Sequence, residues 1–211
     1  MAQETDWDNF RVGTISSGTF YKRNLIHWDL LRESVRRARG GLLEVGVGSG
    51  AQSALASRWV ARTVTLDNDH RIMQTALVNL RRFGPSTGAV GGDGFVMPFR
   101  DQTFGVAISQ GLMEHFKDEQ IGALVREQLR VARSVVFSVP SDNYPRQDVG
   151  NERLMPPARW LEIVRGQVDT SRFRVAARYY RGDVESLKYS LLARRRLGSF
   201  SVLATVDPIH A

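Results

Sequence analysis

The sequence predicts an α/β fold in which helices cover both faces of a mainly parallel sheet. Short apolar and β-branched runs alternate with amphipathic helical stretches along the chain, which is the order that builds such a sheet. The chain has 211 residues, 42% of them hydrophobic and 24% charged, as is usual for one soluble domain. We find no internal repeat and no linker, so we expect one domain spanning residues 1–211.

Five strands with intervening helices are expected between residues 42 and 140. The run 133–140 is the clearest strand, because it is nearly all apolar and ends at Pro140, which cannot continue a ladder. Residues 69–83 place apolar side chains at helical spacing and end before a Gly-Pro pair. The other strands are expected at 42–47, 62–67, 88–93 and 104–110, and the other helices at 50–60 and from Asp118 onward.

The two flanking regions have different characters. Residues 25–39 form an amphipathic pattern, which predicts a helix that packs on the sheet or caps a cleft. Residues 141–157 are rich in turn formers, and a connection of that length is more often a functional loop. The remaining elements are expected as a helix at 158–166, a strand at 173–180, a helix at 185–195 and a last strand at 200–206.

Composition excludes several classes of protein. The chain has no cysteine, which rules out disulfides, thiolate metal sites and cysteine nucleophiles. No apolar run approaches the roughly 18 residues of a membrane span, and the acidic start "MAQETDWDNF" does not resemble a secretory signal. We therefore expect a cytoplasmic protein without membrane association, as a monomer or a homodimer. We expect no metal site.

The net charge of +7 is a reason to consider nucleic acid as a partner. The arginines are spread over several helical stretches, however, and no aromatic residues alternate with them as a platform for stacked bases requires. Charge runs of this kind are usually solvated helix faces. RNA binding therefore stays possible but is not favoured.

The stretch "LLEVGVGSG", residues 42–50, indicates a nucleotide ligand. Glycines between a strand and a helix let a ligand approach the backbone and direct N–H groups toward it. Gly46, Gly48 and Ala51 satisfy the dinucleotide pattern GxGxxG/A, and Asp67 follows Gly46 by 21 positions, near the spacing of a ribose-binding carboxylate. An NAD-dependent oxidoreductase is therefore one interpretation.

A second interpretation rests on resemblance. "EVGVGSG" resembles the E-x-G-x-G-x-G signature of class I methyltransferases that use S-adenosylmethionine, and "VTLDND", "GGDGFVMPFRDQTFGVAISQGLMEHF" and "LRVARSVVFSVP" resemble that family's later motifs in order and spacing. The resemblance covers roughly residues 42–140. It implies a three-layer, Rossmann-like fold with a seven-stranded, mainly parallel sheet whose last strand is antiparallel. One departure is Gly105, where the family commonly has an aspartate after the phenylalanine, and we interpret it as local packing.

The resemblance also implies roles for individual residues. Asp67 would bind the ribose hydroxyls and Asp93 the adenine amine, whereas Asp69 is better explained as a helix N-cap. The methionine end would be held by the loop, by Glu44 through the loop geometry, by the backbone near Gln110 and by Tyr21. The full predicted set of cofactor-binding residues is Tyr21, Glu44, Gly46, Gly48, Gly50, Asp67, Asn68, Asp93, Gly94, Phe95 and Gln110.

Glu114 and His115 follow the fourth strand and are the candidates for a catalytic base, although either could have a structural role. No Asn/Asp-Pro-Pro-Tyr motif follows that strand, which favours a small-molecule acceptor methylated on oxygen or nitrogen. RNA methylation and a protein that binds the cofactor without turnover remain alternatives. We expect residues 1–40 to cover the cleft, 41–140 to bind the cofactor and 141–211 to contribute the acceptor side.

Overall fold

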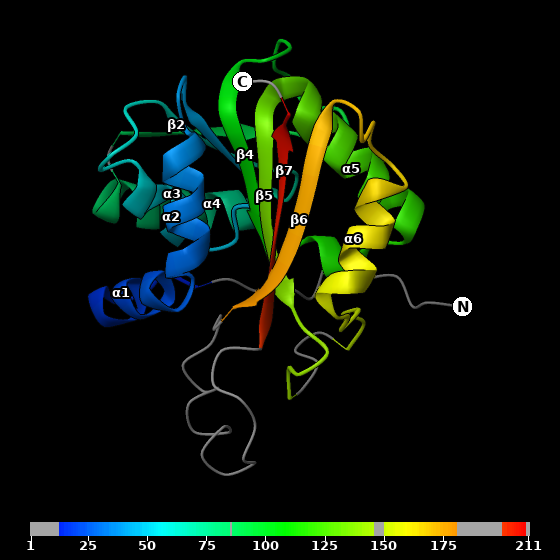
Figure 1. The fold of residues 1–211 in the computed structure, drawn as a ribbon. Coiled ribbons are helices and arrows are strands. Elements are labelled where there is room, and N and C mark those ends of the chain that lie inside the picture. The colour runs from blue at the N-terminus through cyan, green and yellow to red at the C-terminus, as the bar shows by residue number, and fades with distance from the viewer. Residues whose placement is uncertain (1–12, 85, 146–149, 181–199, 210–211) are drawn as a thin grey trace.

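The computed structural model describes residues 13–84, 86–145, 150–180 and 200–209 and contains one sheet of seven strands (Figure 1). The strand order is β3-β2-β1-β4-β5-β7-β6. The strands are β1 (Leu42–Val45), β2 (Thr63–Asp67), β3 (Thr87–Gly91), β4 (Phe104–Gln110), β5 (Ala132–Pro140), β6 (Phe173–Tyr180) and β7 (Ser201–Pro208).

The register confirms the predicted topology. Strands β1 to β5 pair in parallel, whereas β7 is antiparallel to both of its neighbours, β5 and β6. The carboxyl ends of β1, β2 and β4 therefore meet at one edge of the sheet, which is where ligands bind in open α/β sheets.

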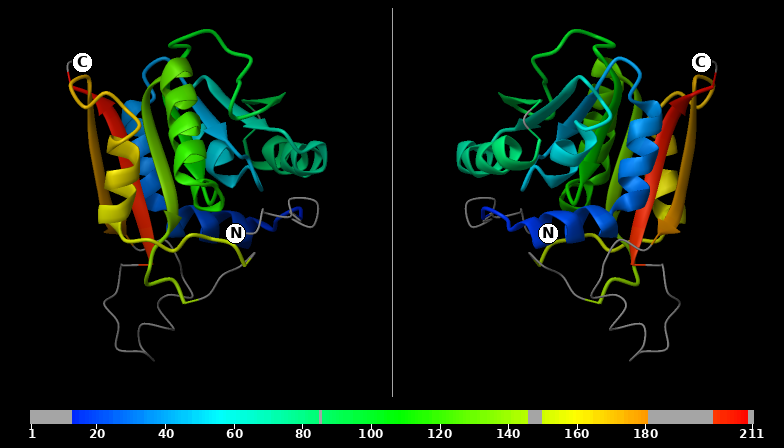
Figure 2. Two further views of the ribbon diagram at one scale, coloured as in Figure 1. Left: turned by 90° about the vertical axis from the view of Figure 1, so that its right-hand side faces the viewer. Right: turned by 90° about the vertical axis from the view of Figure 1, so that its left-hand side faces the viewer.

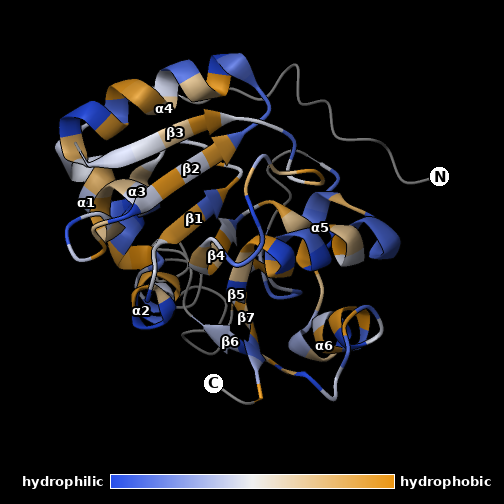
Figure 3. Cartoon of the chain, turned by 90° about the horizontal axis from the view of Figure 1, so that it is seen from above, coloured by the Kyte–Doolittle hydropathy of each residue, from blue (hydrophilic) through white to orange (hydrophobic). Residues whose placement is uncertain are grey.

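Helices form the two outer layers (Figure 2). They are α1 (Ser17–Ile26), α2 (Trp28–Arg37), α3 (Ala51–Ala56), α4 (His70–Phe83), α5 (Asp118–Val131) and α6 (Pro157–Arg165). One buried cluster joins α2, α3 and α4 to one face of the sheet, and a second joins α5 and α6 to the other face. Figure 3 shows these helices with polar residues outside and apolar residues toward the central strands. The three-layer sandwich is thus confirmed.

The N-terminal helix differs from the expected one. The pattern 25–39 predicts one helix, whereas the chain forms α1 and α2 with a corner at His27. The Nδ1 atom of His27 lies 2.8 Å from the hydroxyl of Tyr180 at the end of β6. A contact across 153 residues gives no local sequence signal, which explains the error. The helix expected at 185–195 lies outside the described residues.

Gly105 stands where the methyltransferases that this sequence resembles commonly have an aspartate, and the local packing leaves no room for a side chain. A Cβ at this position would stand 2.2 Å from the carbonyl oxygen of Arg39 and 2.5 Å from that of Arg37. The connection between α2 and β1 therefore passes directly against the start of β4, and only glycine leaves room for it. The interpretation as local packing agrees with this arrangement.

Candidate functional site: a cleft at the carboxyl edge of the sheet

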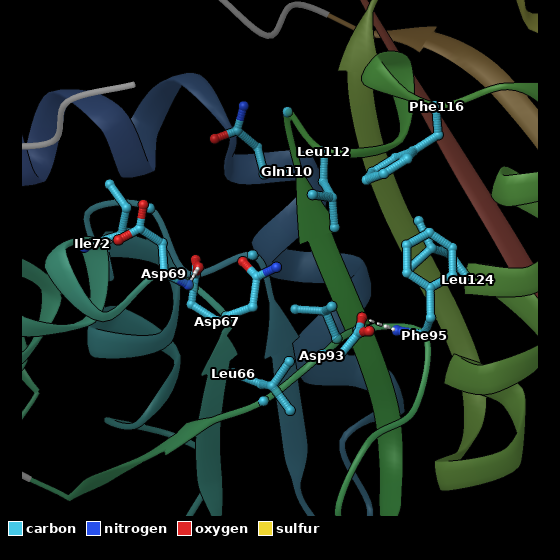
Figure 4. A pocket seen from close by; sticks show the side chains of 17 residues that line it. Leu66, Asp67, Asp69, Ile72, Asp93, Phe95, Gln110, Leu112, Phe116 and Leu124 are labelled. Carbon is cyan, nitrogen blue, oxygen red and sulfur yellow. Dashed lines mark hydrogen bonds between the residues drawn. The ribbon is translucent and has the colours of Figure 1, made fainter. Parts of the chain in front are cut away.

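A cleft lies at the carboxyl ends of β1, β2 and β4, between the glycine loop and helix α5 (Figure 4). Asp67 and Asp93 both line it, with Asp69 and Ile72 on one side and Phe95, Phe116 and Leu124 on the other. The complete lining consists of Val45, Gly46, Gly48, Leu66, Asp67, Asn68, Asp69, Ile72, Gly92, Asp93, Gly94, Phe95, Gln110, Gly111, Leu112, Phe116 and Leu124.

The glycine loop, residues 46–50, depends on left-handed backbone conformations. The φ angles of Gly46, Gly48 and Gly50 are 75°, 50° and 74°, which side chains other than glycine rarely allow. A Cβ on Gly46 would also come within 3.2 Å of the cleft-lining Leu112. The backbone of Gly46 and Gly48 therefore faces the cleft without a side chain in between.

Glu44 anchors this loop to helix α3 from behind. Its side chain is buried, and its Oε2 accepts hydrogen bonds from the backbone N–H and the hydroxyl of Ser53. Burial raises the pKa of Glu44 to about 7, although the bonds from Ser53 oppose this shift. Glu44 does not line the cleft, so its part in binding would act through the shape of the loop.

Asp67 is held in a fixed orientation by backbone groups. Its Oδ2 accepts the N–H of Val47 at 3.0 Å, and its Oδ1 accepts the N–H of Asp69 at 3.0 Å. Burial raises the pKa of Asp67, and these backbone bonds act in the opposite direction. Each carboxylate oxygen can still accept a second hydrogen bond. Asp67 thus presents two preoriented acceptors to the cleft.

Asp93 stands at the turn after β3, beside the apolar side of the cleft. Its Oδ1 accepts the backbone N–H of Phe95 at 2.9 Å, so this donor is already used. The ring of Phe95 meets that of Phe116 edge to face, with a centroid distance of 5.4 Å. A Cβ on Gly94 would stand 3.3 Å from Leu124. This part of the cleft suits a flat ring with a polar edge.

Asp69 has the predicted structural role. It is the N-cap of α4 and accepts the backbone N–H groups of Arg71 and Ile72. The guanidinium of Arg71 also binds it and lowers the pKa of Asp69 to about 2. Asp69 nevertheless lines the cleft, so it adds negative charge there.

Glu114 and His115 lie in the short 3-10 helix Met113–His115, which follows β4. Glu114 is 3% exposed, and its Oε2 has no hydrogen-bond partner among the described residues. Burial and the charge of Glu152 raise the pKa of Glu114 to about 8. The Nδ1 of His115 lies 2.8 Å from Oδ1 of Asn151 in the long loop. A Cβ on Gly111, which lines the cleft, would stand 3.6 Å from Oε1 of Glu114.

Most of the predicted residues come together in this cleft. Those that line it are Gly46, Gly48, Asp67, Asn68, Asp93, Gly94, Phe95 and Gln110. Gly50 ends the loop as the N-cap of α3, and Gly50, Glu44, Glu114 and His115 lie outside the lining. Tyr21 is half exposed on α1 and packs edge to face on Phe20, so its predicted contact with the methionine carboxylate stays a prediction.

Of the large apolar side chains in the lining, sequence reasoning found Phe95 and missed the others. Leu124 belongs to the apolar stripe of α5 and Ile72 to that of α4, and such spacing indicates core residues. Leu112 and Phe116 flank the two candidate catalytic residues without being polar themselves. Their only sequence signal is their position on either side of Met113-Glu114-His115, next to the two candidate catalytic residues.

The segment that builds this cleft is similar to a known protein domain. Residues 42–134 match the sequence profile of the methyltransferase domain. Comparison with curated proteins gives no match.

Solved structures share the fold at low sequence identity. A SAM-dependent methyltransferase from Aquifex aeolicus has a TM-score of 0.65 and 13% identity over 92% of this chain and 98% of its own. The [4+2]-cyclase SpnF has a TM-score of 0.65 and 14% identity over 99% and 88%. Phosphoethanolamine N-methyltransferase 1 of Haemonchus contortus, in complex with phosphoethanolamine and S-adenosylhomocysteine, has a TM-score of 0.60 and 9% identity over 81% and 39%.

The family match covers the residues that build the cleft, and the sheet has the topology that the resemblance implied. The segment that builds the cleft is therefore similar to a methyltransferase domain, and the described chain shares its fold with methyltransferases that use S-adenosylmethionine.

The residues of the cleft fit this cofactor. Two carboxylates, Asp67 and Asp93, face one hollow that has an apolar side, and the missing Cβ atoms of Gly46 and Gly94 leave it open. The cleft has a volume of about 140 Å³, and its lining reaches the exposed Gln110. When bound, S-adenosylmethionine supplies an electrophilic methyl group. The chain itself supplies orientation, through donors and acceptors that are fixed before binding.

Proposed function

We propose that this protein is a methyltransferase that depends on S-adenosylmethionine and acts on oxygen or nitrogen of a small-molecule acceptor. One observation carries the proposal: three carboxylates, Asp67, Asp69 and Asp93, line the cleft, and no lysine or arginine does so among the described residues. A polyanion such as RNA would be repelled there, because nucleic-acid sites rely on lysine and arginine to neutralise phosphates. The neighbour from Haemonchus contortus, an N-methyltransferase bound to phosphoethanolamine, supports a small acceptor.

In this proposal Glu114 is the base that removes a proton from the acceptor. A hydroxyl or ammonium group must lose its proton before or during methyl transfer, and a base with a pKa near the working pH does this best. Glu114 has a pKa raised to about 8 and lies behind Gly111 of the cleft. His115 is the second candidate, and its bond to Asn151 would orient the ring. We also propose that Tyr21, Asn68 and Gln110 bind the cofactor, as the sequence predicts.

The proposal is tested by measuring release of S-adenosylhomocysteine with a panel of small amines and alcohols and with short RNAs. We expect turnover with a member of the small-molecule panel and none with RNA. For that acceptor, kcat/KM should rise with pH up to about 8, and Glu114→Gln should reduce it by roughly 10²- to 10⁴-fold. Turnover with RNA that falls as salt rises would contradict the acceptor class.

The alternative of a protein that binds the cofactor without transferring methyl groups makes a different prediction. Such a protein would bind S-adenosylhomocysteine but release none with any acceptor. The fold alone does not decide this point, since the cyclase SpnF shares it. The assay for release of S-adenosylhomocysteine therefore distinguishes a methyltransferase from a protein that only binds the cofactor.

A further inference from the structure

A second hollow lies at the opposite edge of the sheet, at the amino ends of β4, β5 and β6. It measures about 540 Å³, which lies within the roughly 300–1,000 Å³ of small-molecule sites. We call it the amino-edge groove. It is lined by Asp101, Gln102, Arg126, Leu129, Arg130, Arg133, Gln167, Val168, Asp169, Arg172, Phe173 and Pro208.

Four arginines and two aspartates give the groove an excess of positive charge. Arg130 is fully engaged within the protein. Its guanidinium donates to both oxygens of Glu127, to Asp101 and to the carbonyl oxygens of Met97 and Phe99. Arg130 and Asp101 therefore neutralise each other, and the groove's spare charge must come from the remaining arginines.

Arg126 is held in place but keeps free donors. Its NH1 lies 2.7 Å from Oε1 of Gln167, and its Nε and NH2 donate no hydrogen bond within the described residues. Gly122 makes this position possible, because a Cβ there would stand 2.4 Å from the same Oε1. The guanidinium of Arg126 is thus preoriented at the side of the groove.

Arg133 and Arg172 supply most of the spare donors. Neither guanidinium makes a hydrogen bond or ion pair within 4.0 Å in the part of the chain that the structure describes. Arg172 packs over the ring of Phe173 at 5.8 Å, and the carboxylate of the nearby Asp169 is bound by the N–H and hydroxyl of Ser171. Both arginines can therefore bind an anion without breaking an existing contact.

We propose that the amino-edge groove binds a small organic phosphate, with Arg126, Arg133 and Arg172 around the phosphoryl group and an apolar body against Leu129 and Phe173. Guanidinium groups match the paired oxygens of phosphoryl and carboxylate groups, and a phosphoryl group has a further oxygen for another guanidinium. Asp101 and Asp169 disfavour a long phosphate backbone, which would have to pass these carboxylates. The site is separate from the cleft and does not depend on the proposed acceptor.

The test is calorimetric titration with phenyl phosphate, which joins a phosphoryl group to an apolar ring and lacks the adenosine that the cleft would take. We expect saturable binding at constant ionic strength, at least tenfold weaker in R133Q/R172Q. The control R58Q/R81Q removes two exposed arginines elsewhere that make no side-chain hydrogen bond among the described residues, and it should bind like the wild type. Affinity for S-adenosylhomocysteine should be equal in all three proteins, which shows that the variants fold.

Three results would overturn the proposal. Equal binding of phenyl phosphate to the wild type and to R133Q/R172Q would place the ligand elsewhere. Absence of saturable binding would show that the arginines attract anions only nonspecifically and form no binding site. Binding of a short RNA through the same arginines without binding of phenyl phosphate would identify the groove as a polyanion surface.

Discussion

Replacing Glu114 by glutamine should stabilise the protein, and more so as the pH rises. Glu114 is buried, its Oε2 has no hydrogen-bond partner among the described residues, and its pKa is raised from 4.5 to about 8. Between these two pH values the unfolded chain has released the proton while the folded protein retains it, so the free energy of unfolding falls as the pH rises. Glutamine has a similar shape and never ionises, so it removes this loss.

The size of the effect follows from the pKa shift. At about 1.4 kcal/mol per pH unit, a shift of this size corresponds to roughly 5 kcal/mol at most. Because the amide of glutamine must itself be hydrogen-bonded, we expect a net gain of roughly 2–5 kcal/mol at pH 8.5 and less than about 1 kcal/mol at pH 5. Urea unfolding of both proteins at a series of pH values measures the difference.

Glu119 provides a matched control, since it is exposed on α5 five positions away. Glu119→Gln should leave the pH dependence of stability unchanged. If Glu114→Gln changed the free energy of unfolding by the same amount at pH 5 and pH 8.5, the carboxyl would not be buried as described. If Glu114→Gln gains stability and loses turnover, Glu114 is a residue that serves function and lowers stability.

Three further predictions concern other parts of the molecule. Asp67→Asn should weaken binding of S-adenosylhomocysteine by roughly 10- to 100-fold in calorimetry, because a charge-assisted acceptor is lost, and unchanged affinity would contradict its role. Gly105→Ala should lower the melting temperature by several degrees, since its Cβ would collide with the carbonyl of Arg39, and an unchanged melting temperature would refute the close packing. Burial lowers the pKa of His27 to about 4, so the wild type should lose up to about 3 kcal/mol more stability than His27→Gln between pH 7 and pH 4, and parallel curves would refute this.

The sequence was sufficient for the parts of the site that depend on local pattern. Gly46, Gly48 and Asp67 follow from a turn and a strand end, and the parallel arrangement of β1, β2, β3 and β4 brings them and Asp93 to one edge. The same alternation of strands and helices predicts the sheet, and the family resemblance supplies its antiparallel last strand.

Other features depend on contacts between distant segments, which no local pattern reveals. The corner at His27 is accompanied by a contact with Tyr180, and no glycine or proline marks it. Leu124 has the spacing of a core residue and serves as one, yet it also lines the cleft. That Oε2 of Glu114 has no hydrogen-bond partner among the described residues becomes visible only when its surroundings are known.

The most direct measurement is a calorimetric comparison of S-adenosylhomocysteine and NAD as ligands of the wild type and of the double variant Asp67→Asn/Asp93→Asn. We predict that one S-adenosylhomocysteine binds per chain, that the double variant binds it much more weakly, and that NAD binds weakly or not at all. Tighter binding of NAD, or equal binding of S-adenosylhomocysteine to both proteins, would contradict a cleft in which these two carboxylates hold one nucleoside.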